Sequence, residues 1–264
     1  MNTVSTASIF GMAISLILCV GVPTALYIIL KVKTKAKFTD MLLGAVTFIL
    51  FALFLEQILH MLVLNTLGEK LTGNLWLYVL YGGAAAAVFE ECGRLVAMKV
   101  FLKNRLVKEN ALMYGVGHGG IEAVLVGGYG CIANLATVAL INGGTLETAL
   151  AGLDEAARAS SMATISQLWT LPSYIFYMTG IERVIAVVLQ ISLSYLVYRA
   201  VRYHRWGFFA AAMGIHFAVD AVTVILSKYL PIPALEAILA VAVALIAFAA
   251  ARLYRGETAQ AESK

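Results

Sequence analysis

Long apolar runs recur along almost the whole chain, and short polar connections separate them. A run of 18 or more apolar residues is long enough to cross a bilayer as a helix, so we expect these runs to be membrane spans. The predicted spans are residues 7–30, 41–64, 75–102, 110–140, 173–198, 206–228 and 233–252. The pattern therefore predicts an all-α fold, a polytopic transmembrane helix bundle of about seven spans. We expect residues 1–255 to form one integral membrane domain and residues 256–264 a polar cytoplasmic tail.

Composition excludes the soluble classes. The chain is 61% hydrophobic and 13% charged, whereas soluble domains are nearer 45–50% apolar and about 25% charged. Cys19, Cys92 and Cys131 stand singly inside predicted spans, which argues against a disulfide framework and a zinc ribbon. The net charge of +4 is not the footprint of a nucleic-acid-binding protein, so we expect membrane lipid as a partner and no nucleic acid.

Lysine and arginine are unevenly divided between the two sides of the predicted bundle. The connections after the first, third and fifth spans and the C-terminal tail hold 14 of the 19 basic residues. The opposite side holds Lys70, Arg158 and Lys228. By the positive-inside rule the C-terminus is cytoplasmic and the N-terminus outside. We expect a multi-pass protein of a plasma membrane, bacterial in origin.

The third predicted span carries Glu90, Glu91 and Arg94. A charged side chain at the bilayer centre costs about 2.5–3.5 kcal/mol on insertion scales, so such residues mark functional sites. Glu90 and Arg94 are four apart and share a helix face, while Glu91 is turned away by about 100°. We expect Arg94 to neutralise one carboxylate and leave the other for chemistry. The alternative is a structural ion pair that fixes helix packing, which would not need the second glutamate.

Two further spans each carry a histidine and a carboxylate four residues apart. His118 precedes Glu122 in the fourth span, and His216 precedes Asp220 in the sixth. Such pairs suit metal ligation or a base oriented by a carboxylate. Either pair alone could equally be a histidine hydrogen-bonded within a bundle.

Depth in the membrane connects these polar residues. At 1.5 Å per residue, the two glutamates of the third span lie about 16–18 Å from the cytoplasmic end of their helix. The pair of the fourth span lies about 12 and 18 Å from its cytoplasmic end, and the pair of the sixth about 15 and 21 Å. Three helices thus bring polar residues to one level, and we expect a single site within a core of residues 75–228.

A second polar set lies nearer the outer face. It consists of Glu56 and His60 in the second span and Glu182 and Arg183 in the fifth. We expect Arg183 to form a structural pair with Glu56 or Glu182, because an arginine offers a ready partner. The alternative is a role in a proton or substrate pathway.

The three motifs together resemble those of intramembrane proteases of the CAAX-prenyl endopeptidase and bacteriocin-processing superfamily and their PrsW relatives. Those families carry a Glu-Glu pair followed by a basic residue, then a Phe-x-x-x-His or Phe-x-x-x-Glu, then a His-x-x-x-Asn or His-x-x-x-Asp. This chain has Glu90-Glu91-Cys92-Gly93-Arg94, His118-Gly119-Gly120-Ile121-Glu122 and His216-Phe217-Ala218-Val219-Asp220 in that order. The His-Gly-Gly-x-Glu version is most similar to the YhfC-type membrane peptidases.

The resemblance implies a role for each motif residue. Glu90 or Glu91 would be the general base that activates water, and Glu122 would help to hold that water or a metal. His216 and Asp220 would polarise the scissile carbonyl and stabilise the oxyanion. His118 departs from the pattern, because it stands where the related families have Phe, and it adds a possible ligand.

Both a glutamate-only and a metal-dependent hydrolysis fit these residues. Amide hydrolysis needs an activated water, an oxyanion stabiliser and a proton donor to the leaving amine. With His118, Glu122 and His216 as ligands, one divalent metal could supply the activated water, and zinc is the first candidate. We expect an intramembrane endopeptidase acting on a peptide or membrane-protein substrate. The alternatives are a proton-coupled transporter that uses these residues as a relay, and a non-catalytic membrane partner.

Overall fold

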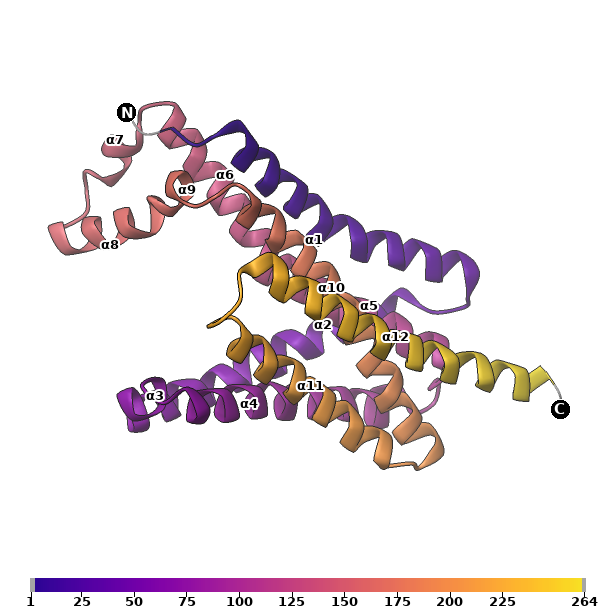
Figure 1. The fold of residues 1–264 in the computed structure, drawn as a ribbon. Coiled ribbons are helices and arrows are strands. Elements are labelled where there is room, and N and C mark those ends of the chain that lie inside the picture. Colours follow the sequence, from indigo (N-terminus) through magenta and orange to yellow (C-terminus); the bar gives the residue numbers. More distant parts are fainter. Residues whose placement is uncertain (1–2, 263–264) are drawn as a thin grey trace. The chain divides into compact units, whose positions relative to one another are not determined.

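The computed structural model of the chain describes residues 3–262, and the regular elements in that range are all helical (Figure 1). The first half contains α1 (Thr6–Lys33), α2 (Phe38–Phe48), η1 (Ile49–Glu56), α3 (Gln57–Thr72), α4 (Leu75–Val96), η2 (Ala97–Phe101), α5 (Lys108–Glu122) and η3 (Ala123–Gly128). The second half contains α6 (Tyr129–Asn142), α7 (Leu146–Leu150), α8 (Glu155–Ile165), α9 (Gln167–Thr170), α10 (Tyr174–Tyr203), α11 (Gly207–Leu226) and α12 (Ile232–Glu262). The segments η1, η2 and η3 are π-helical and continue the helices that precede them. The all-α prediction is confirmed.

Six helices of the described chain are long and apolar enough to cross a membrane. They cover Thr6–Lys33, Phe38–Thr72, Lys108–Asn142, Tyr174–Tyr203, Gly207–Leu226 and Ile232–Thr258. The remaining predicted span, residues 75–102, is a continuous helix formed by α4 and η2, but it is not one of these six. Its crossing of the membrane, like the orientation of the termini, stays a prediction. Helices suit this environment because their backbone groups are satisfied within the segment.

The described chain divides into two compact units. Residues 3–22 and 123–184 form the first, and residues 23–122 and 185–262 form the second. The first unit has its own apolar cluster, which joins the start of α1 to α6, α9 and α10 through Val4, Met12, Val138, Ile141, Leu168 and Phe176. A buried serine ties two of these helices, because the Ser15 hydroxyl donates to the Phe176 carbonyl at 2.5 Å.

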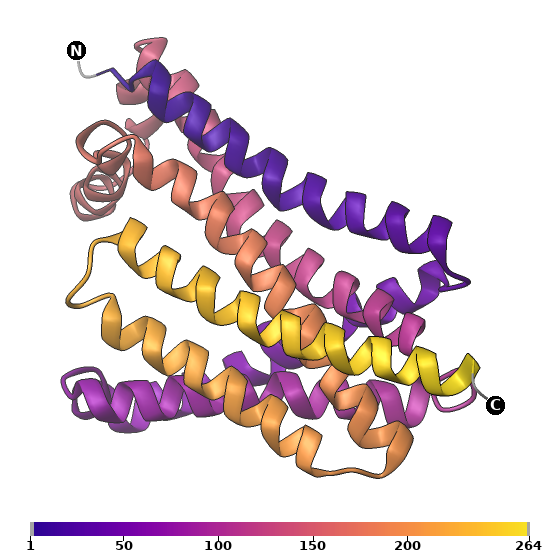
Figure 2. The ribbon, with the colours of Figure 1, turned by 45° about the vertical axis from the view of Figure 1, so that its right-hand side comes forward.

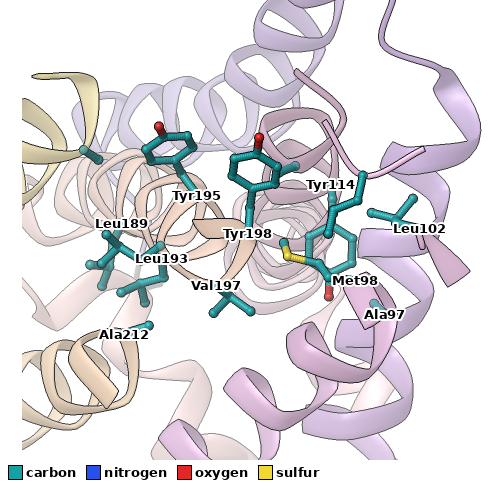
Figure 3. Packing of buried hydrophobic residues seen from close by; sticks show 14 of the residues in the cluster. Ala97, Met98, Leu102, Tyr114, Leu189, Leu193, Tyr195, Val197, Tyr198 and Ala212 are labelled. Atoms are coloured by element: carbon teal, nitrogen blue, oxygen red, sulfur yellow. The ribbon is translucent and has the colours of Figure 1, made fainter. Parts of the chain in front are cut away.

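The second unit contains the larger apolar cluster. Figure 3 shows its aromatic part, where Tyr195 and Tyr198 of α10 lie near Tyr114 of α5 and Met98 of η2. The Tyr195 and Tyr198 rings stack with their centroids 5.7 Å apart. In the same unit α11 runs alongside α4 (Figure 2).

Glycines set the close crossing of α2 and α5. A Cβ atom on Gly117 would lie 1.8 Å from the Met41 carbonyl oxygen, and one on Gly44 would lie 2.1 Å from the Tyr114 carbonyl oxygen. Only glycine allows backbones to approach this closely. α5 also packs closely against α10, since a Cβ on Gly119 would lie 2.9 Å from the Gln190 Cβ. The glycines around His118 therefore fix α5 between α2 and α10.

Candidate active site

Glu90 and Glu91 lie on α4, and Arg94 contacts both of them. The Arg94 Nη2 atom is 3.5 Å from Glu90 Oε2, and its Nη1 atom is 3.4 Å from Glu91 Oε1. All three residues are buried. Arg94 thus contacts both carboxylates, although its single positive charge can offset only one of the two negative charges. The two glutamates precede Arg94 by four and three residues, and the forked guanidinium can reach both neighbours with separate nitrogens.

His118 of α5 lies against the same cluster. Its Nε2 atom is 2.9 Å from Glu90 Oε2 and 3.1 Å from Arg94 Nη2, and its side chain is fully buried. The ring also meets Phe48 edge-on, with centroids 5.2 Å apart. His118 is therefore held both by charged groups and by aromatic packing.

His216 of α11 approaches from the other side of the glutamate pair. Its Nδ1 atom is 2.8 Å from Glu91 Oε1, while its Nε2 atom is 3.6 Å from Asp220 Oδ2 and 4.0 Å from Glu90 Oε2. His216 is buried, whereas the Asp220 side chain is 36% exposed. The three predicted motifs thus meet in one cluster.

Gln190 of α10 belongs to this cluster, and the motif search did not find it. Its Nε2 atom donates to Glu90 Oε2 at 3.0 Å and to Glu122 Oε2 at 2.8 Å. Its Oε1 atom accepts from Arg94 Nη2 at 2.5 Å, and its backbone carbonyl accepts from Arg94 Nη1. A polar amide in the middle of a long apolar span was the available signal.

One group of side chains in the described chain could hold a metal ion. Glu90, His118 and Glu122 each offer a ligand atom, and these atoms lie within 4.8 Å of one another. His216 was predicted as a ligand with His118 and Glu122, but it lies against Glu91 and outside this group.

The surroundings of His118 Nε2 fit a cation. A protonated Nε2 can donate to Glu90 but cannot accept from Arg94, whereas an unprotonated Nε2 does the reverse. A divalent cation satisfies the nitrogen and both carboxylates together, because all three are electron-pair donors. One imidazole with two carboxylates is a set of donor atoms that zinc accepts.

Glu56 and His60 lie beside the cluster in the second unit. His60 Nε2 is 3.2 Å from Glu56 Oε1, and His60 Nδ1 is 2.7 Å from the Tyr81 hydroxyl. Glu56 is close enough to Glu90 and His216 to interact with them electrostatically. The π-helical segment η1 ends at Glu56, and η3 begins directly after Glu122. Such π-helical turns are frequent at functional sites.

The other predicted supporting residues, Glu182 and Arg183, lie in the first unit. Arg183 forms an ion pair with Glu182, the residue before it. Glu182 is one of the two partners considered for Arg183.

A groove opens beside Asp220 between α4 and α11. It has a volume of about 250 Å³ and is lined by Tyr78, Gly82, Gly83, Asp220 and Thr223 among others. A Cβ added to Gly82 would meet no atom within 4 Å, so this glycine borders open space. Asp220, a partly exposed acid of the cluster, thus lines this groove, which we call the lateral groove.

Comparison with known proteins agrees with this geometry. A family model described as "YhfC intramembrane metalloprotease" matches residues 15–246. The chain is 35% identical over 224 residues to a protein of Bacillus subtilis (strain 168) described as "Uncharacterized membrane protein YhfC", and the match covers 83% of this chain and 86% of that protein. No solved structure matches the chain.

Proposed function

We propose, because this chain belongs to the YhfC intramembrane metalloprotease family, that it hydrolyses a peptide bond in or beside the bilayer. The main observation behind this proposal is that three helices bring carboxylates and imidazoles into one buried cluster at hydrogen-bonding distance. Buried charges inside a multi-pass membrane protein are costly, so their convergence favours a catalytic role over packing alone. A peptide or another membrane protein is the proposed substrate.

Glu90, His118 and Glu122 are the proposed metal ligands, with zinc as the proposed metal. When bound there, the metal would activate a water molecule and polarise the substrate carbonyl. Gln190 holds Glu90 and Glu122 through one amide nitrogen, and Arg94 contacts both glutamates of the pair and offsets one of their two negative charges. Both are positioning residues in this scheme, since outer hydrogen bonds orient metal ligands.

Glu91 is the proposed general base. Its Oε1 atom faces His216 and Arg94, while its buried Oε2 atom has no hydrogen-bond partner among the described residues. That oxygen can therefore accept a proton from the attacking water. His216 can pass a proton to the leaving amine, because Glu91 and Asp220 hold its ring from opposite nitrogens. Asp220 supports this orientation from the edge of the lateral groove, the proposed path of the substrate.

The decisive experiment combines hydrolysis and metal measurement on the purified full-length chain in lipid vesicles. The substrate probe is a library of quenched fluorescent transmembrane peptides. We expect hydrolysis by the wild type, its loss in Glu91→Gln and His216→Asn, and its loss on chelation with recovery on adding zinc. His204→Asn is the matched control, because His204 is exposed outside the cluster and has a φ of 53°, which asparagine tolerates.

Metal content separates ligands from acid–base residues. We expect Glu122→Gln to lower the zinc bound per chain, whereas Glu91→Gln retains it. Full hydrolysis in every site variant, or proton flux into the vesicles without peptide cleavage, would refute the proposal and favour a transporter.

A further inference from the structure

Two cavities of the second unit adjoin at Tyr254, away from the glutamate cluster. The first is a groove of about 290 Å³ between α1, α5, α10 and α12. Its walls are almost entirely apolar and include Leu26, Leu112, Val188, Ile191, Ala247 and Ala251. The second is a polar pocket of about 520 Å³ that includes Lys33, Lys35, Glu109, Asn110 and Tyr254. Tyr254 lines both cavities.

Positive charge dominates the polar end. Lys33 and Lys35 line the pocket, and neither forms an ion pair within residues 3–262. Arg255 lines the adjoining end of the groove. The acid in the pocket wall, Glu109, accepts a hydrogen bond from the Tyr254 hydroxyl at 3.2 Å. The Lys108 ammonium lies 4.4 Å from the centroid of the Tyr254 ring and adds a fourth cation. A second carboxylate, Glu257, lies close enough to Tyr254 to interact with it electrostatically and accepts hydrogen bonds from the Tyr195 and Tyr198 hydroxyls. Four cations thus face two carboxylates here.

We propose that these two cavities together bind one anionic phospholipid. An acyl chain occupies the apolar groove, and the phosphate headgroup occupies the pocket beside Lys33, Lys35 and Arg255. The charge is complementary to a phosphate, and basic pockets between membrane helices are known to hold anionic headgroups. Four of the helices capable of spanning a membrane line the groove: α1, α10, α12 and the helix that begins with α5. A hydrocarbon chain is the apolar occupant available there.

The chemistry of the two parts predicts two separable effects. The headgroup pocket discriminates by charge, because each nearby lysine or arginine favours an anionic lipid by about fivefold. The groove discriminates little between headgroups, since it buries only the acyl chain of the lipid. Loss of Lys33 and Lys35 therefore removes most of the headgroup selectivity, whereas filling the groove weakens the binding of every lipid.

The test is a lipid titration of the purified full-length chain in detergent, read by native mass spectrometry. The probes are phosphatidylglycerol and phosphatidylcholine with identical acyl chains. We expect wild-type protein to prefer phosphatidylglycerol by about 100-fold, on the strength of two lysines and one arginine. Lys33→Gln combined with Lys35→Gln should reduce the preference to about fivefold, the contribution of the remaining Arg255.

Matched controls keep the outcomes distinct. Lys31→Gln combined with Lys103→Gln removes the same charge from exposed positions outside both cavities and should leave the preference unchanged. Ala247→Trp fills the groove and should weaken both lipids, whereas Ala249→Trp on the exposed side of α12 should weaken neither.

Equal wild-type affinity for the two lipids, an unchanged preference in the Lys33/Lys35 double variant, or unchanged binding in Ala247→Trp would each overturn the proposal. Thermal unfolding of every variant checks that the fold is retained.

Discussion

Replacing Gln190 with leucine tests how the site is held together. The side chain connects Glu90, Glu122 and Arg94 through three hydrogen bonds of 3.0, 2.8 and 2.5 Å. Leucine keeps most of the volume and removes every polar contact of the amide. The ligand carboxylates would then lose the donor that orients them toward each other.

The magnitude follows from those contacts. A hydrogen bond to a charged group contributes about 1.5–3 kcal/mol. Glu90 keeps Arg94 and His118 as partners, so the three losses do not add in full. We expect the free energy of unfolding of the metal-free protein to fall by about 3 kcal/mol, roughly the value of one or two such bonds. Loss of an outer-shell partner also weakens metal binding by about 10–100-fold.

The assay measures zinc affinity by competition with a chelating dye and thermal unfolding in detergent. Ser192→Ala is the control, since Ser192 is buried on the same helix and donates only to the Val188 carbonyl, at 2.8 Å. A Gln190→Leu protein with zinc affinity within threefold of wild type and unchanged stability would refute the inferred role of Gln190.

Three further substitutions test the packing, the charge balance and the groove. Gly117→Ala places a Cβ atom 1.8 Å from a carbonyl oxygen and should lower the stability by about 1–3 kcal/mol or more, measured by thermal unfolding; Gly130→Ala, which meets nothing within 4 Å, should not. Arg94→Lys keeps the positive charge but loses the forked guanidinium. It should therefore lower the stability by less than Arg94→Ala, for which we expect a loss of about 3–5 kcal/mol. Equal losses in the two variants would contradict this. Gly82→Leu should fill the lateral groove and abolish peptide hydrolysis while zinc content stays at the wild-type level; retained hydrolysis would mean that the substrate enters elsewhere.

The all-helical fold and the meeting of the three motifs were predictable from the sequence. Membrane thickness limits helix length, so counting residues from the polar ends places Glu91, His118 and His216 at one depth. Depth in the membrane alone does not determine which of these side chains are in contact. The contacts depend on how each helix is rotated about its axis, and that rotation is set by packing against neighbouring helices.

Gln190 and the double contact of Arg94 were not predicted, for different reasons. A polar amide in an apolar span signals a buried hydrogen-bond partner, but it forms no spacing motif, so nothing in the sequence linked Gln190 to residues about 70–100 positions away. The Arg94 fork was predictable in principle, because both glutamates are helical neighbours of it. The sequence could not tell which histidine to propose as a metal ligand, because that depends on which glutamate each histidine approaches. His118 of α5 approaches Glu90, whereas His216 of α11 approaches Glu91.

The two halves of the cluster differ in how firmly the fold holds them, and this difference matches the roles proposed for them. His118 and Glu122 lie on α5, which glycine crossings hold between α2 and α10 with almost no free space. A rigid half suits metal ligands, whose positions must be preorganised. His216 and Asp220 lie on α11. The packing of α11 against α4 is interrupted by the lateral groove, which Gly82 of α4 borders. Because His216 lies on this side, the proposed proton donor to the leaving amine is close to the proposed path of the substrate.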